Sequence, residues 1–189
     1  AGPERTADMP PGVAFHLAVT AMAPAFGAGA YVSPGLVPSV QSPFLYWEAV
    51  PAEARRVSRL AAAAARALIA AGDGARAQRI IEQQVDVEWD SELAGLYAEC
   101  RGGDTLGRIA RAEKWLEKHP EDARLLLALG RLCREQQLWG KAQSYFEASL
   151  AIQSSQDAHV ELATLFAQLG RSEESNQAYR SAAALCRQG

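Results

Sequence analysis

Histidine and cysteine, the side chains that most often carry catalysis or hold metals, are few and scattered in this chain. They are His16, His119, His159, Cys100, Cys133 and Cys186. The sequence contains no CxxC, CxxCH, HExxH or GxGxxG motif, no phosphate-binding loop and no nucleophile elbow. We therefore expect no enzyme activity, no metal site and no resident cofactor. We interpret the cysteines as structural thiols, two of which fall on helical apolar faces, where a free cysteine behaves as a small hydrophobe.

A set of arginines offers a different chemistry, the recognition of a carboxylate. Counted from the core positions given below, they occupy outward positions on the first helix of two helix pairs. The set is Arg59, Arg66, Arg124, Arg131 and Arg134, and in the last pair the same face carries Asp157, Val160, Thr164 and Gln168. A basic strip in a chain of net charge −3 indicates an acidic or C-terminal peptide segment as the partner. The alternative is an ordinary solvated face on which glutamate neighbours balance the arginines.

Charge is distributed unevenly along the chain, which indicates a domain boundary. No Asp, Glu, Lys or Arg occurs between Asp8 and Glu48. We divide the chain into an Ala/Gly/Pro-rich segment, residues 1–45, and a helical domain, residues 46–189. The small net charge gives no general attraction to nucleic acid, so we expect protein partners instead.

The segment 1–45 allows three interpretations. Its prolines prevent any long helix, which favours a poorly ordered or loosely packed linker. A short helix that packs on the domain is the second interpretation. The third is part of a membrane or signal segment, because the window from Val13 to Val32 is apolar.

The elements that must position the arginines follow from the pattern at Leu125–Leu150. Two helices are expected there, with a turn at 137–140, and their inward positions alternate small and large residues. These positions are Leu126, Leu129, Gly130, Cys133, Ala142, Phe146 and Ser149. They match the core slots of the tetratricopeptide repeat (TPR), a unit of about 34 residues made of two antiparallel helices.

The same pattern recurs at a fixed period, which turns one repeat unit into an array. A shift of 33 residues relates Leu129 to Leu162, Cys133 to Phe166, Gln137 to Gly170 and Phe146 to Tyr179, and a backward shift of 65 relates Gln137 to Gly72. Further helices are expected at 52–71, 75–87, 91–101 and 105–119. The sequence therefore predicts an all-α TPR solenoid of about four helix pairs in a right-handed superhelix, with Leu162, Phe166 and Tyr179 in the core of the last pair.

From residue 46 to residue 185 the chain resembles the C-terminal repeat domain of the HemY-type, haem-biosynthesis-associated TPR proteins of proteobacteria. The resemblance lies in residues 89–99, 112–150 and 162–180, above all in the Leu-Gly-Arg-Leu-Cys run at 129–133 and the Leu-Trp-Gly-Lys-Ala run at 138–142. This family is distinct from the protoporphyrinogen oxidase that has shared its name, which would need a flavin-binding glycine fingerprint.

The resemblance implies a scaffold for late haem (protoporphyrin) biosynthesis whose partners are enzymes of that pathway. It also implies association with the bacterial inner membrane through N-terminal helices, with the repeat domain on the cytoplasmic side. The charge-free run at 9–45 departs from the charged amphipathic helices that the family would have there.

Two alternatives to this scaffold stay open. One is a generic peptide-binding TPR module, although a clamp for chaperone tails is disfavoured because Ala62 and Arg66 stand where its Lys and Asn set would be. The other is a haem or porphyrin carrier that uses His119, His159 or Cys133 as a ligand.

Overall fold

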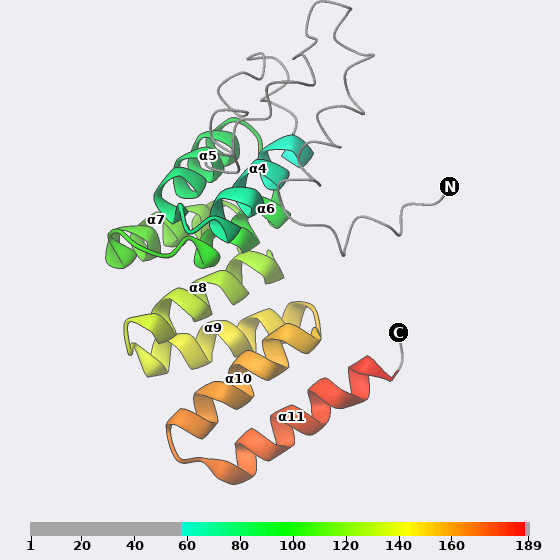
Figure 1. Ribbon diagram of the computed structural model, residues 1–189. Coiled ribbons are helices and arrows are strands. Elements are labelled where there is room, and N and C mark those ends of the chain that lie inside the picture. Colours follow the sequence, from blue (N-terminus) through cyan, green and yellow to red (C-terminus); the bar gives the residue numbers. More distant parts are fainter. Residues whose placement is uncertain (1–57, 188–189) are drawn as a thin grey trace, which may run out of the picture. The chain divides into compact units, whose positions relative to one another are not determined.

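The computed structural model describes residues 58–187 of the chain (Figure 1). Within that range the structure consists of helices and contains no strand. The chain divides into two compact units, one that ends at Arg101 and one that begins at Gly102, and we describe each by itself. The predictions for residues 1–45, including the domain boundary, lie outside the described residues.

The first unit contains α4 (Ser58–Ala70), α5 (Gly74–Val87), α6 (Ser91–Leu96) and the 3₁₀ helix η3 (Tyr97–Glu99). Leu60 and Leu68 of the alanine-rich α4 are buried, as are Ile80 and Ile81 of α5. Asp73 caps α5 by accepting a hydrogen bond from the backbone N–H of Arg76. The sequence predicts an inward Ala71 as well, but this residue is exposed because α4 has already ended.

The helix predicted at 91–101 is broken earlier than expected. α6 ends at Leu96, and the chain continues as a single 3₁₀ turn. Beyond the 3₁₀ turn the backbone comes close to the first residue of α5, because a Cβ atom at Gly74 would stand 2.2 Å from the carbonyl oxygen of Arg101. Only glycine leaves room for the chain to cross α5 there. The apolar residues at helical spacing in this segment are nevertheless all buried: Leu93, Leu96, Tyr97 and Cys100.

The second unit contains α7 (Thr105–Lys118), α8 (Ala123–Glu135), α9 (Trp139–Ile152), α10 (Gln156–Gln168) and α11 (Ser172–Cys186). The last four helices follow one another as two antiparallel pairs (Figure 1). We call α8 and α9 the third pair, and α10 and α11 the fourth pair. In α7, Ile109, Ala112 and Trp115 are buried, whereas Leu116 is half-buried.

The core of the third pair is built as the sequence predicts. Leu126, Leu129, Gly130, Cys133, Ala142, Phe146 and Ser149 are all buried. The ring of Phe146 lies directly on Gly130, where an added Cβ atom would stand 2.3 Å from a ring carbon. The carboxylate of Asp122 caps α8 by accepting hydrogen bonds from the backbone N–H groups of Arg124 and Leu125 at 3.0 and 2.9 Å.

The fourth pair departs from the prediction at one core position. Leu162 and Phe166 are buried, but Tyr179, predicted as core, is 44% exposed. Tyr179 corresponds to Phe146, and Ala163 corresponds to Gly130. The methyl group of Ala163 occupies the space that Gly130 leaves open for an aromatic ring. In the part of the chain that the structure describes, no helix follows α11 to cover the tyrosine from the other side.

The turns inside the helix pairs confirm the repeat period. Gly72, Gln137 and Gly170 all adopt left-handed backbone conformations, with φ of 81°, 57° and 73°. These are the three positions that the shifts of 33 and 65 residues bring into register. A left-handed residue closes the C-terminus of a helix, and glycine adopts it most readily. The period in the sequence therefore corresponds to a repeated backbone geometry.

Candidate functional site: an arginine face on α8 and α10

The predicted arginine strip is divided between the two units, so we describe each part separately. In the first unit Arg59 and Arg66 are exposed on α4. Arg66 forms an ion pair with Glu92 of α6, while Arg59 has no ion pair within the described residues. An exposed pair of this kind contributes little to stability. Arg59 and Arg66 therefore form no more than an exposed basic edge on α4.

In the second unit two arginines hold one carboxylate. The Nε atom of Arg131 lies 2.7 Å from Oε1 of Glu161, and Nη2 of Arg134 lies 2.9 Å from Oε2 of the same residue. The arginines stand on α8 and the glutamate on α10, so the ion pairs join the first helices of the third and fourth pairs. The side chain of Glu161 is 15% exposed and each arginine side chain is 25% exposed. Charge-assisted hydrogen bonds at this partial burial are stronger than those on an open surface.

Arg124 stands on the same face of α8 as Arg131. The two residues are separated by two helical turns, which corresponds to about 10 Å along the axis. Arg124 is exposed and forms no ion pair within residues 58–187. Leu127, between them on this face, is half-buried. The face therefore offers two cationic positions separated by an apolar patch.

The neighbouring face of α10 is mostly uncharged. Asp157 and Gln168 are exposed, and so is the side chain of Val160 at 36%. The Thr164 hydroxyl donates a hydrogen bond to the backbone carbonyl of Val160. We name the surface formed by Arg124, Leu127, Arg131, Arg134 and Glu161 the arginine face.

Both interpretations of the arginines find support in these contacts. Arg66, Arg131 and Arg134 each have a glutamate partner, as the solvated-face interpretation expects, whereas Arg59 and Arg124 have none among the described residues. The sequence pattern does not single out Glu161 as a partner of the arginines. The available signal was its separation of 30 residues from Arg131, close to one repeat period, which places the two on adjacent first helices.

A second polar cluster ties α7 to α9. The carboxylate of Glu113 accepts hydrogen bonds from Lys141 at 3.0 Å and from Tyr145 at 2.9 Å. Burial acts to raise the pKa of Glu113, but the hydrogen bonds from Lys141 and Tyr145 outweigh it and lower the pKa below its usual value. Burial and the Glu113 carboxylate together raise the pKa of Tyr145. Glu113 and Lys141 therefore stay ionised at neutral pH and Tyr145 stays protonated, and the cluster acts as a tie between helices.

The residues considered as haem ligands are not brought together. Cys133 is fully buried, and burial raises the pKa of its thiol to about 11, so it is neither accessible nor a thiolate. His119 ends α7. His159 stands on α10, where burial lowers its pKa. Within residues 58–187 there is no group of three or more His, Cys, Asp or Glu side chains that could hold a metal ion.

His159 borders a surface groove of about 410 Å³. The lining residues are Leu150, His159, Leu162, Glu173, Glu174, Gln177, Ala178 and Ser181. The floor is apolar and the charged groups on the rim are carboxylates. One of them, Glu174, is already engaged in an ion pair with Arg171.

None of the described helices combines the length and the apolar character that a membrane span requires.

Comparison with known proteins supports the fold. No family model and no curated protein matches the chain. Among solved structures the chain is similar to MamA AMB-1 in its P212121 form, with a TM-score of 0.53 and 18% identity over 79% of this chain and 90% of that one. It is also similar to the MamA RS-1 ArsTM double mutant, with a TM-score of 0.52 and 13% identity over 96% and 98% of the two chains.

A third structure, MamA MSR-1, has a TM-score of 0.50 and 15% identity over 77% of this chain and 86% of that one. MamA is an all-helical, TPR-like protein. At these identities the similarity concerns the fold alone. The chain therefore has an all-α fold of the tetratricopeptide-repeat type.

Proposed function

We propose that this chain is a non-enzymatic protein-interaction module that binds an acidic segment of a partner protein on the arginine face. The observation that carries the proposal is the pair of contacts by which Arg131 and Arg134 hold one carboxylate at 2.7 and 2.9 Å. Two guanidinium groups around a single carboxylate form a geometry selective for that group. Arg124 adds a second cationic position on the same face of α8.

The fold agrees with this role. First helices of successive repeats lie side by side in such arrays and present a continuous surface to a partner. In the second unit the ion pairs of Glu161 show α8 and α10 in this arrangement. The exposed positions on this face serve no packing role in the core, so they are available for recognition.

The finer part of the proposal concerns the pathway. We place the module in late haem biosynthesis, as a scaffold for enzymes of that pathway, on the cytoplasmic side of the bacterial inner membrane. Its support is the sequence resemblance at 112–150 and 162–180, which is more specific than the general repeat pattern. A generic peptide-binding module remains the alternative, and it shares the same arginine face.

Partner capture tests both levels of the proposal. Full-length chain is immobilised and exposed to detergent-solubilised bacterial membranes, and the retained proteins are identified by mass spectrometry. The test variant is Arg131→Gln with Arg134→Gln. Glutamine is preferable to charge reversal, because two added carboxylates beside Glu161 would repel one another and disrupt the contact between α8 and α10.

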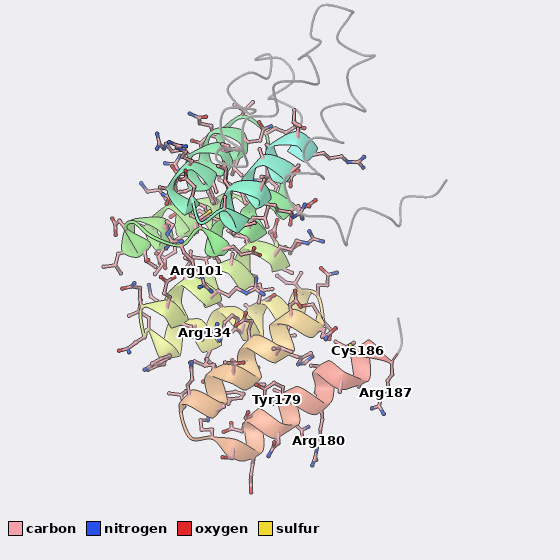
Figure 2. All side chains as sticks on the ribbon, viewed as in Figure 1. Arg101, Arg134, Tyr179, Arg180, Cys186 and Arg187 are labelled. Carbon is pink, nitrogen blue, oxygen red and sulfur yellow. The ribbon has the colours of Figure 1, made fainter. Side chains whose placement is uncertain are left out.

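The matched control is Arg180→Gln with Arg187→Gln, which removes the same charge from exposed positions on α11 and at its C-cap (Figure 2). We expect the control to retain the partners of the unaltered chain and the Arg131/Arg134 variant to lose them, while thermal unfolding shows both folded. Ferrochelatase or protoporphyrinogen oxidase among the partners supports the haem pathway. Partners of other kinds favour the generic peptide-binding module. Equal retention of partners by both variants would contradict binding on the arginine face.

A haem carrier is less consistent with the described residues. Cys133 is inaccessible, and the groove beside His159 has carboxylates on its rim that repel the propionate groups of haem. We expect haem titration of the full-length chain to produce no shift of the Soret band. A shift that His159→Ala abolishes would instead support the carrier.

A further inference from the structure

We propose that Glu161 is an internal occupant of the arginine face and that a glutamate side chain of the partner takes its place on binding. The inference rests on the proposed function, because it concerns how the same arginines reach an acidic partner. Glu161 uses both carboxylate oxygens, one for Arg131 and one for Arg134. In the free chain, the best-placed donors of the site are therefore already engaged.

The burial of the three side chains indicates exchange of one carboxylate for another. The side chain of Glu161 is only 15% exposed and its carboxylate contacts both arginines, which leaves little room for a second carboxylate between them. A partner glutamate that enters the site restores the same charge-assisted hydrogen bonds, while the displaced Glu161 regains hydration. The free energy gained when the partner glutamate forms these hydrogen bonds nearly cancels the free energy lost when Glu161 gives them up. The site alone therefore gives weak binding.

Net affinity must therefore come from contacts that Glu161 does not make. Arg124 is exposed and without an ion pair among the described residues, and it lies about 10 Å along α8 from Arg131. A peptide in the polyproline II conformation has three residues per turn and advances about 3.1 Å per residue, so residues i and i+3 lie on the same side and cover about this distance. The half-buried Leu127 lies between the two arginines and favours an apolar side chain in the middle.

The resulting ligand is a segment in the polyproline II conformation, with two glutamates three residues apart and an apolar residue between them. One glutamate replaces Glu161 between Arg131 and Arg134, and the other meets Arg124. A suitable probe is a fluorescein-labelled peptide, Gly-Ser-Glu-Leu-Ser-Glu-Ser-Gly, amidated at its C-terminus so that it presents no terminal carboxylate. Binding to the full-length chain is measured by fluorescence anisotropy.

The decisive variant is Glu161→Gln, and its matched control is Asp157→Asn. Asp157 lies one turn before Glu161 on α10, is exposed, and has no ion pair within the described residues. Both variants remove one negative charge near the site, but only the first removes the occupant. We expect Glu161→Gln to bind the peptide about tenfold more tightly than the unaltered chain. Asp157→Asn should tighten binding of the peptide by less than about twofold.

Glu161→Asp is a second variant in case the glutamine disturbs folding. Its shorter side chain keeps the charge but reaches the arginines less well, so we expect an affinity between those of the unaltered chain and Glu161→Gln. Thermal unfolding of each variant checks that the fold is retained. Equal gains for Glu161→Gln and Asp157→Asn would mean that only net charge matters, and weaker binding by Glu161→Gln would make Glu161 a positioning residue. Either result overturns the inference.

Failure of the proposed function has a different signature. If Arg131→Gln with Arg134→Gln binds the peptide as well as the unaltered chain does, the arginine face itself is not the binding site. The spacing is tested with a peptide of equal charge in which the two glutamates are adjacent. We expect the peptide with adjacent glutamates to bind up to about fivefold more weakly than the probe. With Arg124→Gln, the two peptides should bind with equal affinity. Tighter binding of a free C-terminal carboxylate than of the amidated probe would instead assign the site to chain termini.

Discussion

The third and fourth helix pairs share one sequence pattern but differ in what they bury and expose. Both begin with a side-chain cap, Asp122 in one and Ser155 in the other. Both close their inner turn with a left-handed residue. In each pair a buried serine on the second helix donates a hydrogen bond to a backbone carbonyl of the first helix. Ser149 donates to Ala123, and Ser175 donates to Ala163. The backbone requirements of the repeat are thus met twice.

The differences lie in the aromatic contact and in the surface. The third pair buries Phe146 on Gly130, whereas the fourth leaves Tyr179 44% exposed beside Ala163. On the outward face, Arg124, Arg131 and Arg134 correspond to Asp157, Thr164 and Ala167. This comparison teaches that positions serving the backbone keep their role, while outward positions are available to define a binding surface.

The largest expected effect comes from removing the two aromatic rings. Phe146→Ala should lower the free energy of unfolding by about 3–5 kcal/mol, because it leaves a cavity in a filled core. Tyr179→Ala should lower it by less than about 1.5 kcal/mol, because nearly half of the tyrosine already faces solvent. Urea unfolding followed by circular dichroism measures both values. Similar losses for the two variants would show that the pairs are equally packed.

Gly130→Ala copies the alanine of the fourth pair into the third. The new Cβ atom would stand 2.3 Å from the Phe146 ring, so the buried ring must move. We expect a loss of about 1–3 kcal/mol, typical of overpacking. The same unfolding experiment with Gly130→Ala and Phe146→Leu combined should recover part of this loss. Unchanged stability of the single variant would refute the close contact.

Gln137→Gly copies the turn of the fourth pair into the third. Gln137 has a φ of 57°, a conformation that costs a side chain more than it costs glycine. Glycine also adds conformational freedom to the unfolded chain, which offsets part of this benefit. The free energy of unfolding should therefore rise by about 0.5–1 kcal/mol. Gly170→Gln, with a φ of 73° at the corresponding position, should lose a similar amount. The melting temperatures of both variants test this symmetry.

A smaller effect distinguishes the two pairs in acid. Glu113, which ties α7 to α9, has a lowered pKa. Its stabilising contribution is therefore complete above the usual value of 4.5 and is lost as the pH falls through the lowered pKa. Glu174 of the fourth pair also has a lowered pKa, through Arg171, but is fully exposed. Below pH 4.5 the urea concentration at the unfolding midpoint should fall with pH. We expect Glu113→Gln to make this fall smaller, and Glu174→Gln to affect the fall less.

Much of the fold could be predicted because helix periodicity is a local property. The spacing of Leu126, Leu129 and Cys133 places them on one face of a helix, and all three are buried. The cap at Asp122 and the turn at Gln137 likewise depend on short-range hydrogen bonds and backbone conformation. A fixed period then repeats these local rules along the chain.

Other features depend on contacts between distant residues. The helix that begins at Ser91 ends at Leu96, and the Arg101 backbone then passes close to Gly74, a contact that no local pattern records. Tyr179 occupies a core position of the repeat, but its burial depends on what stands opposite, and Ala163 fills the space that Gly130 leaves empty.

The arginine face shows the same division between sequence and structure. By itself the sequence determined the repeat, its core faces and the outward position of Arg124, Arg131 and Arg134, because each follows from the geometry of a single helix. Only the tertiary structure decided that Glu161, on the next first helix, lies between two of these arginines. The physical reason is that helix packing sets which charges meet, and a spacing of 30 residues becomes a hydrogen-bond distance only after two helices have packed.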